Sequence, residues 1–437
     1  MARIKKFSNK MFLSDLHQIF SFDSHDELEK YKTSLFPIGK TTDEIQTTSI
    51  FLSSLSAVKE YREEVFTDIG FKKIKNQNIQ LHAYQEIPCS EGDDRPDGLL
   101  VITSGIYNPV IEWICFLEVK IGNNLIGTEQ IERYIDTGKK LNIENIITIS
   151  NQLVTTPFES PAQIKKRVKY NLFHWSWVYL SVTAGRLLRN DLVEDVDHIY
   201  ILTELRKYFD NHSGLKNYTG MDSDWKESTE EFLEKNNKDL IQKIINSYKQ
   251  EEKDICLQLT DSTGHYILLK TNSEPREEVL RKMLTENKII TSTFFIQENP
   301  KQTFSIDIDF VKRKIICYTN YTISAGKAKA QTTKLINMFT KDISNEDDIY
   351  IGAIYPYKTK SNIQFETLAN LLKQKEEGQY CIVNKDMGDT IKEFDSRLGD
   401  DDITLTINLY LLCVRTSSLI IKRLPVSFDF YFSIHSS

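Results

Sequence analysis

Trp113-Ile114-Cys115-Phe116-Leu117-Glu118-Val119-Lys120 is the stretch of sequence that decides the fold. It opens with residues that are almost all apolar, which is typical of a central strand covered on both faces. It closes with two charged residues two positions apart, and alternate side chains of a strand point to the same face. The stretch therefore predicts a buried strand that ends in a carboxylate and an ammonium group placed side by side.

The segments around this strand predict a mixed α/β domain. A helix is expected over residues 41–68, opened by Thr41 and Glu44 at the spacing of a capping box. Alternating or β-branched residues predict strands, and amphipathic spacing predicts a helix after the central strand. The expected order is a helix (41–68), strands (79–87, 99–103 and 113–120), a helix (128–141), a strand (146–150) and added helices (162–170, 173–188 and 199–209).

The second half of the chain has a different pattern of strand and helix signals, which predicts a separate α+β domain. A polar break over 211–220 precedes a charged helix over 224–252. The expected domains are 1–215, a helical linker over 216–253, and 254–437. The expected elements of the last domain are strands (255–259, 266–270, 289–296, 304–310, 314–318, 349–354 and 403–414) and helices (327–340 and 364–374).

Composition describes a globular chain of 437 residues with 40% hydrophobic and 27% charged residues. A net charge of −7 does not point to nucleic acid, but a local basic groove is compatible with it. The six cysteines are scattered without a C-x-x-C pair, which favours reduced core thiols. No apolar run approaches the length of a membrane span, so we expect a cytoplasmic protein without a membrane partner.

Three polar side chains have the chemistry of a metal-dependent phosphodiesterase. Asp97 lies in Arg95-Pro96-Asp97-Gly98, at the start of the strand that precedes Glu118 and Lys120. The two carboxylates and the backbone carbonyl of Val119 form a set of hard oxygen ligands, which suits Mg²⁺ or Mn²⁺. Lys120 would orient an attacking water or neutralise charge on the phosphoryl oxygens. The alternative is a surface ion pair with Asp97 capping a turn, which the apolar flanks of the strand disfavour.

The helix after the central strand carries two further candidates. Gln130 and Tyr134 lie four residues apart and therefore share one helix face. They either support the site or form an ordinary half-buried face. Glu60, from the first helix, is a candidate for an additional metal ligand, with Glu63 and Glu64 as competitors; for Glu60 a structural role is favoured.

Asp97 followed by Glu118-x-Lys120, a helix and a strand resembles the PD-(D/E)XK nuclease superfamily. Gln130-x-x-x-Tyr134 resembles the Q-x-x-x-Y element of its RecB-like branch. The resemblance covers about residues 41–152 and implies a restriction-endonuclease-like αβββαβ core, an Mg²⁺ site at Asp97 and Glu118, and Lys120 acting on the attacking water. One departure is that no His lies between Asp43 and Asp68, where RecB-like nucleases often have one.

The resemblance implies a nuclease acting on nucleic acid, with DNA favoured, and by analogy a role in defence against foreign DNA or in repair. Lys165, Lys166, Arg167 and Lys169 form a basic cluster that either contacts phosphates or covers a solvated helix face. Two other functions stay open: a non-catalytic binding module, and a nuclease activated by a ligand of the second domain. A homo-oligomer is also compatible with the sequence.

Overall fold

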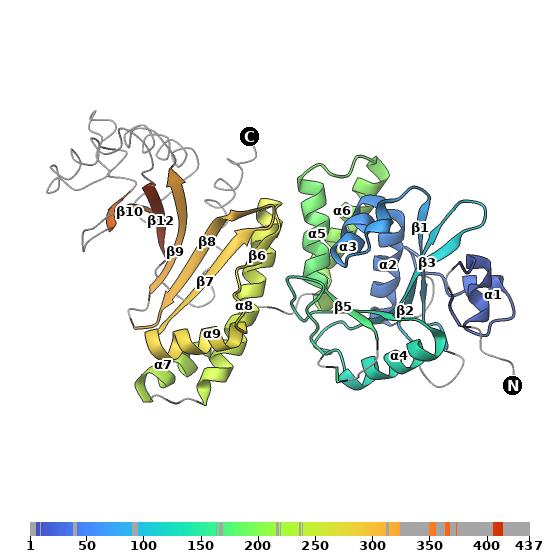
Figure 1. Ribbon diagram of the computed structural model, residues 1–437, viewed down its shortest axis with the longest axis horizontal. Coiled ribbons are helices and arrows are strands. Elements are labelled where there is room, and N and C mark those ends of the chain that lie inside the picture. The colour runs from blue at the N-terminus through green and yellow to red at the C-terminus, as the bar shows by residue number, and fades with distance from the viewer. Residues whose placement is uncertain are drawn as a thin grey trace. The chain divides into compact units, whose positions relative to one another are not determined.

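The computed structural model describes most of the first half of the chain and separate stretches of the second (Figure 1). The described residues are 6–8, 10–37, 42–89, 95–162, 164–165, 169–215, 218, 220–235, 237, 239–311, 314–323, 349–354, 363–367, 373 and 405–413. The chain divides into two compact units, Met1–Thr219 and Gly220–Ser437. Among the described helices, none is long and apolar enough to cross a membrane.

The first unit is built on a five-stranded mixed sheet of order β1-β2-β3-β4-β5. Its strands are β1 (Ile79–Gln85), β2 (Gly98–Ser104), β3 (Val110–Val119), β4 (Asn145–Ser150) and β5 (Asn171–Ser176). The first three strands pair antiparallel, and β4 and β5 continue the sheet in parallel from β3. Helix α4 (Thr128–Leu141) connects β3 to β4. The predicted mixed α/β class and the order helix, three strands, helix, strand are confirmed.

Helices lie on both faces of this sheet (Figure 1). One face carries α2 (Asp43–Ala57), α3 (Lys59–Asp68), α5 (Trp177–Arg189) and α6 (Val196–Asn211), and the other carries α4. The short segments are η1 (Leu13–Gln18), α1 (His25–Glu29), η2 (Lys72–Lys75) and η3 (Ser213–Leu215). Covering both faces explains why β3 is apolar over most of its length.

Side chains of β3 alternate between these two helical layers. Trp113 packs edge-on against Phe66 of α3, with ring centroids 5.4 Å apart. Phe116 packs against Tyr134 of α4, with centroids 6.2 Å apart. Glu118 follows Phe116 by two positions and therefore faces α4. The same strand that builds the core thus delivers a carboxylate to the interior on the α4 side.

The single helix expected over 41–68 is two helices. Val58 leaves the helical conformation, with φ −89° and ψ 104°, and both ends α2 and precedes α3. Its side chain is fully buried, so the break places a β-branched residue in the core. The N-cap of α2 is Thr42, whose hydroxyl accepts from the Ile45 N–H, whereas the expected cap Thr41 lies outside the described residues.

The helix expected over 173–188 begins later, because its first residues form β5. Thr148 of β4 pairs in parallel with His174, and this sheet pairing overrides the local helical pattern. Ser176 then caps α5 by accepting from the Tyr179 N–H. In the expected helix over 162–170, the residues that the structure describes are not helical.

The second unit contains a seven-stranded antiparallel sheet of order β11-β10-β12-β9-β8-β7-β6. Its strands are β6 (Ile267–Leu269), β7 (Ile289–Ile296), β8 (Asn299–Asp309), β9 (Lys314–Ile323), β10 (Ile349–Ile354), β11 (Ile363–Thr367) and β12 (Leu405–Cys413). Its helices are α7 (Trp225–Lys235), α8 (Leu240–Thr263), α9 (Arg276–Lys282) and the π-helical turn η4 (Met283–Asn287). The strands expected over 289–296 and 349–354 are confirmed.

Three expectations for the second half differ from the structure. The segment expected as a linker over 216–253 belongs mostly to the second unit, because Phe232 of α7 and Tyr248 of α8 lie in one core cluster with Phe294 of β7. The strand expected over 255–259 is part of α8, whose apolar face continues through it. Residues 364–367, the start of the helix expected over 364–374, lie in β11 (Ile363–Thr367), which pairs with β10. The helix expected over 327–340 lies outside the described residues.

Candidate active site

Asp97, Glu118 and Lys120 meet where β2 begins and β3 ends. Gly98 pairs with Leu117, so the two carboxylates lie on neighbouring strands at the same level. Gly98 permits this approach: a Cβ there would lie 3.0 Å from Leu117 Cδ2 and 3.3 Å from the Leu52 side chain of α2. The antiparallel pairing of β2 with β3, the next strand along the chain, therefore brings the start of β2 beside the end of β3 and creates the cluster.

Direct contacts hold the three side chains together. Asp97 Oδ2 accepts a 2.7 Å hydrogen bond from the Val119 N–H. Lys120 Nζ donates to the Val119 carbonyl at 3.0 Å, lies 3.7 Å from Asp97 Oδ2 and forms an ion pair with Glu118 Oε1. The two carboxylates, the lysine and the Val119 carbonyl predicted from sequence are thus brought into one site.

A third carboxylate, which the sequence analysis did not assign to the site, comes from α2. Glu44 Oε1 lies 3.7 Å from Lys120 Nζ, and Glu44 Oε2 accepts from the Ile121 N–H at 3.3 Å. In the sequence, the spacing of Glu44 from Thr41 predicts only a capping box. Thr42 caps the helix instead, and the Glu44 side chain extends to the end of β3.

Glu60, the candidate ligand from the first helix, is directed elsewhere. Its Oε2 lies 2.7 Å from His198 Nδ1 of α6. Its two competitors are also engaged, Glu63 with Lys59 at 3.6 Å and Glu64 with Arg186. The break at Val58 separates the carboxylates of α3 from the first turn of α2, which carries Glu44. The prediction of one long helix therefore named Glu60, and not Glu44, as the acidic residue that reaches the site.

Gln130 and Tyr134 contribute to the site through hydrogen bonds. The Tyr134 hydroxyl donates to Glu118 Oε2 at 2.7 Å, with the Arg95 carbonyl as a second acceptor at 3.2 Å. Gln130 Nε2 donates to the Tyr134 oxygen at 3.2 Å. The predicted shared face is therefore directed at Glu118, and Tyr134 fixes the orientation of that carboxylate.

The electrostatics of the cluster are unbalanced towards negative charge. Burial, reinforced by the Glu118 carboxylate, raises the pKa of Asp97 to about 8. Burial alone would lower the pKa of Lys120, but Asp97 and Glu118 more than offset it, so this pKa lies above its ordinary value. Burial, with Glu118 second, also raises the pKa of Tyr134 far above its ordinary value. Lys120 thus stays charged, and Tyr134 stays a hydrogen-bond donor, at neutral pH.

The donor atoms fit a hard divalent cation. Glu118 is fully buried, and the Lys120 ammonium group is the charge partner of its Oε1. Among the described residues, no group of three or more His, Cys, Asp and Glu side chains is arranged to hold a metal ion. The donors of Asp97, Glu118 and Val119 form a set of another kind, because the third oxygen is a backbone carbonyl. Two carboxylates and a carbonyl are ligands that Mg²⁺ or Mn²⁺ accepts.

The basic cluster predicted within residues 165–169 is only partly described. Lys165 and Lys169 are exposed, and Lys169 Nζ lies 2.9 Å from Glu144 Oε2. Lys166 and Arg167 lie outside the described residues. Its role in nucleic-acid binding therefore stays a prediction.

Comparison with known proteins gives no relative from which a function could be transferred. No protein-family model, no curated protein and no solved structure matches this chain. The site's own geometry and chemistry are therefore the basis for a functional conclusion.

Proposed function

We propose that the first unit is a metal-dependent nuclease that hydrolyses phosphodiester bonds of nucleic acid, with DNA favoured over RNA. The observation that supports this most is the joint placement of Asp97, Glu118 and Lys120 in one ion-pair cluster at the end of a central strand. Two carboxylates can hold a divalent cation, and a charged lysine in contact with them can stabilise negative charge on the phosphoryl oxygens. They come from separate strands, so the fold rather than sequence proximity unites Asp97 with the other two.

Asp97, Glu118 and the Val119 carbonyl would hold Mg²⁺ or Mn²⁺. When bound, the cation would lower the pKa of a water molecule and neutralise charge that develops on the phosphoryl oxygens. The excess of carboxylates over cationic groups around Lys120 supports this, because an additional positive charge relieves their repulsion.

Side chains of the protein provide the remaining functions of the site. Lys120, which stays charged, donates a hydrogen bond to the attacking water or to a phosphoryl oxygen. Tyr134 holds Glu118 in one orientation, and Gln130 holds the Tyr134 hydroxyl. Glu44 accepts from the backbone after Lys120 and adds negative charge on the α2 side. Each role follows from a contact of the side chain.

The arrangement of secondary structure supports a restriction-endonuclease-like core of the PD-(D/E)XK type. Strand β3 carries Glu118 and Lys120 follows its last residue, α4 carries Gln130 and Tyr134, and β4 pairs in parallel with β3. This is the order that the resemblance implies, with the first helix divided into α2 and α3.

A cleavage assay with matched variants tests the proposal. Purified protein is incubated with plasmid, linear duplex, single-stranded DNA and RNA, each with Mg²⁺, Mn²⁺ or EDTA. We expect metal-dependent cleavage that falls by about 10²–10³-fold or more in Glu118→Gln and in Lys120→Ala, because each removes a group that stabilises the transition state. The substrate cleaved fastest identifies the substrate class.

Glu112 and Lys73 provide the control. Glu112 lies on the same strand β3 and forms a 3.1 Å ion pair with Lys73, away from the cluster. Glu112→Gln and Lys73→Ala should leave cleavage unchanged. No cleavage of any substrate, with nucleic-acid binding equal in the wild type and the two site variants, would instead support the non-catalytic binding module.

A further inference from the structure

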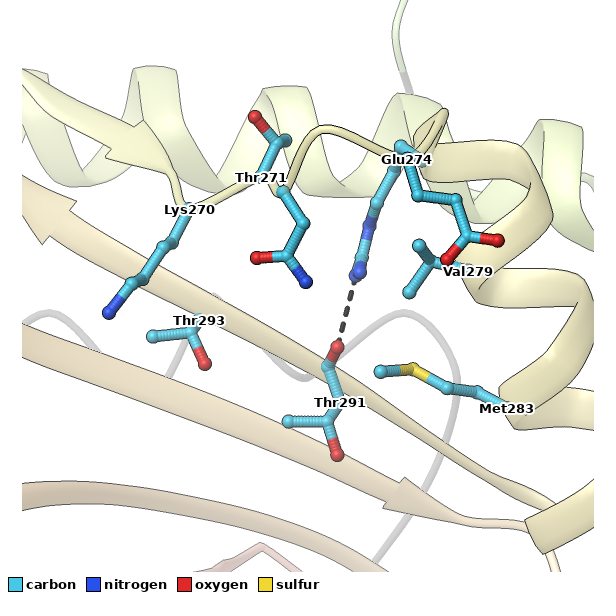
Figure 2. A pocket seen from close by; sticks show the side chains of 9 residues that line it. Lys270, Thr271, Glu274, Val279, Met283, Thr291 and Thr293 are labelled. Carbon is cyan, nitrogen blue, oxygen red and sulfur yellow. Dashed lines mark hydrogen bonds between the residues drawn. The ribbon is translucent and has the colours of Figure 1, made fainter.

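A cavity of about 260 Å³ lies on the second unit, between β7 and the loop that joins β6 to α9 (Figure 2). Figure 2 shows Lys270 at one end, Glu274 and Met283 at the other, and Thr291 and Thr293 of β7 along the floor. The cavity therefore has a cationic end and a carboxylate end. It involves none of the residues of the candidate active site.

Arg276 is a rigid part of the lining because a buried network fixes it. Its Nε donates to both carboxylate oxygens of Glu252, at 3.1 and 3.2 Å, and its Nη2 donates to the Thr291 carbonyl at 3.0 Å. Glu252 is only 2% exposed, and Ser292 beside it is fully buried. Within the described chain nothing accepts a hydrogen bond from Arg276 Nη1, so this group remains available to a ligand.

The charge that remains in the cavity is that of Lys270. Glu252 balances Arg276, and Lys282 forms an ion pair with Glu274. The side chains of Lys270 and Asn272, both exposed residues, have no ion-pair or hydrogen-bond partner among the residues that the structure describes. A cation beside an amide donor favours an oxyanion, because both groups can donate to it.

The opposite end of the cavity has a second feature of a functional site. Met283 begins the π-helical turn η4, and such turns are rare and occur frequently at functional sites. The cavity is slightly smaller than the range of about 300–1,000 Å³ that is typical of ligand pockets. Its size therefore suits a molecule no larger than a phosphorylated pentose.

We propose that this cavity binds a small polyhydroxy compound that carries a phosphate or a carboxylate. The anionic group lies against Lys270 and Asn272, where the uncompensated positive charge is. The hydroxyl groups donate to Glu274 at the other end, and Arg276 Nη1 donates to an oxygen between them. The ligand is thus held by charge at one end and by hydrogen bonds at the other.

Isothermal titration calorimetry on the full-length protein tests this with four probes. Ribose 5-phosphate carries both features, ribonate replaces the phosphate with a carboxylate, ribose lacks the anion, and inorganic phosphate lacks the hydroxyl groups. We expect at least one of the two anionic sugars to bind about tenfold or more tightly than ribose. The tighter of the two identifies the oxyanion.

Variants at the two ends separate their contributions. Lys270→Ala should reduce the affinity for the preferred anionic sugar to that for ribose. Glu274→Gln should weaken the binding of that sugar but not of inorganic phosphate. Lys301→Ala removes an exposed charge on β8 outside the cavity and should change nothing. The absence of binding by both anionic sugars at millimolar concentration, or equal losses in Lys270→Ala and Lys301→Ala, would overturn the proposal.

Discussion

The Lys120–Glu118 pair of the first unit and the Arg276–Glu252 pair of the second each join a buried carboxylate to a partly exposed cation, yet their surroundings are opposite. Glu252 receives hydrogen bonds from Arg276 on both oxygens and one from Ser292, so the charges of the pair balance and both carboxylate oxygens have donors. Lys120 faces Glu118, Asp97 and Glu44 at once, so three carboxylates share one cation. The first pair is left with excess negative charge, whereas the second is not.

This difference separates a structural ion pair from a reactive one. A buried charge costs several kcal/mol unless its partner and hydrogen bonds offset the cost, and the Arg276 network provides both. The cluster at Lys120 leaves like charges in contact, which lowers stability. Such an arrangement is typical of sites that act on a ligand, because the excess negative charge is available to it.

The largest expected effect on stability is at the balanced pair. Glu252→Gln removes the charge that offsets Arg276 and should lower the free energy of unfolding by about 3 kcal/mol, as measured by urea denaturation. Asp224→Asn breaks the exposed pair with Lys243 and serves as the control, with no measurable change expected. Equal effects of the two variants would show that the buried network is not specially stabilising.

At the Lys120 cluster, removal of a carboxylate charge should raise the free energy of unfolding, whereas at the balanced pair it lowers it. The pKa of Asp97 is raised from 3.8 to about 8, so the folded protein holds an extra proton between these values and stability falls as pH rises through them. In EDTA, Asp97→Asn should remove this slope and raise the free energy of unfolding at pH 8 by about 2 kcal/mol, which is below the full linkage value because water reaches the side chain.

Denaturation curves from pH 4 to pH 8 measure this slope. Glu112→Gln, on β3, leaves Asp97 in place and should keep the dependence of stability on pH. If Asp97→Asn is less stable than the wild type at pH 8, the like-charge account of the cluster is wrong.

Local sequence patterns were sufficient to predict those helices and strands whose local pattern agrees with their packing in the folded protein. The apolar run of β3 and the amphipathic α4 were predicted closely, and with them Glu118, Lys120, Gln130 and Tyr134. β5 was missed because its pairing with β4 decides the conformation of residues 171–176, and this pairing is not a local property.

Glu44 shows why part of the site escaped prediction. Its spacing from Thr41 fits a capping box, and this interpretation explained the residue without reference to the rest of the chain. Only the contact between the start of α2 and the end of β3 reveals its position beside Lys120. The extra helix break at Val58 likewise depends on packing, and Glu60, which follows it on α3, contacts α6 instead of the site.

Two variants, one in α2 and one in α3, test whether Glu44 and not Glu60 belongs to the site. Glu44→Gln removes a charge 3.7 Å from Lys120 and should lower the rate of cleavage about tenfold, which corresponds to about 1.4 kcal/mol. Glu60→Gln changes a carboxylate that contacts His198 and should leave the rate unchanged. Single-turnover kinetics measure both rates, and a larger loss in Glu60→Gln would restore the sequence-based choice.

The smallest expected effect concerns Gln130, which contacts Glu118 only through Tyr134. Gln130→Ala removes the 3.2 Å hydrogen bond to the Tyr134 oxygen and should slow cleavage a few-fold, since a neutral hydrogen bond contributes about 1 kcal/mol. Glu129→Ala, at an exposed position of the same helix, should have no effect. In a Tyr134→Phe background the hydroxyl that Gln130 contacts is absent, so Gln130→Ala should slow cleavage no further. Additive losses in the double variant would mean that Gln130 acts on the substrate directly. In that case Gln130 would not support the site through its hydrogen bond to Tyr134.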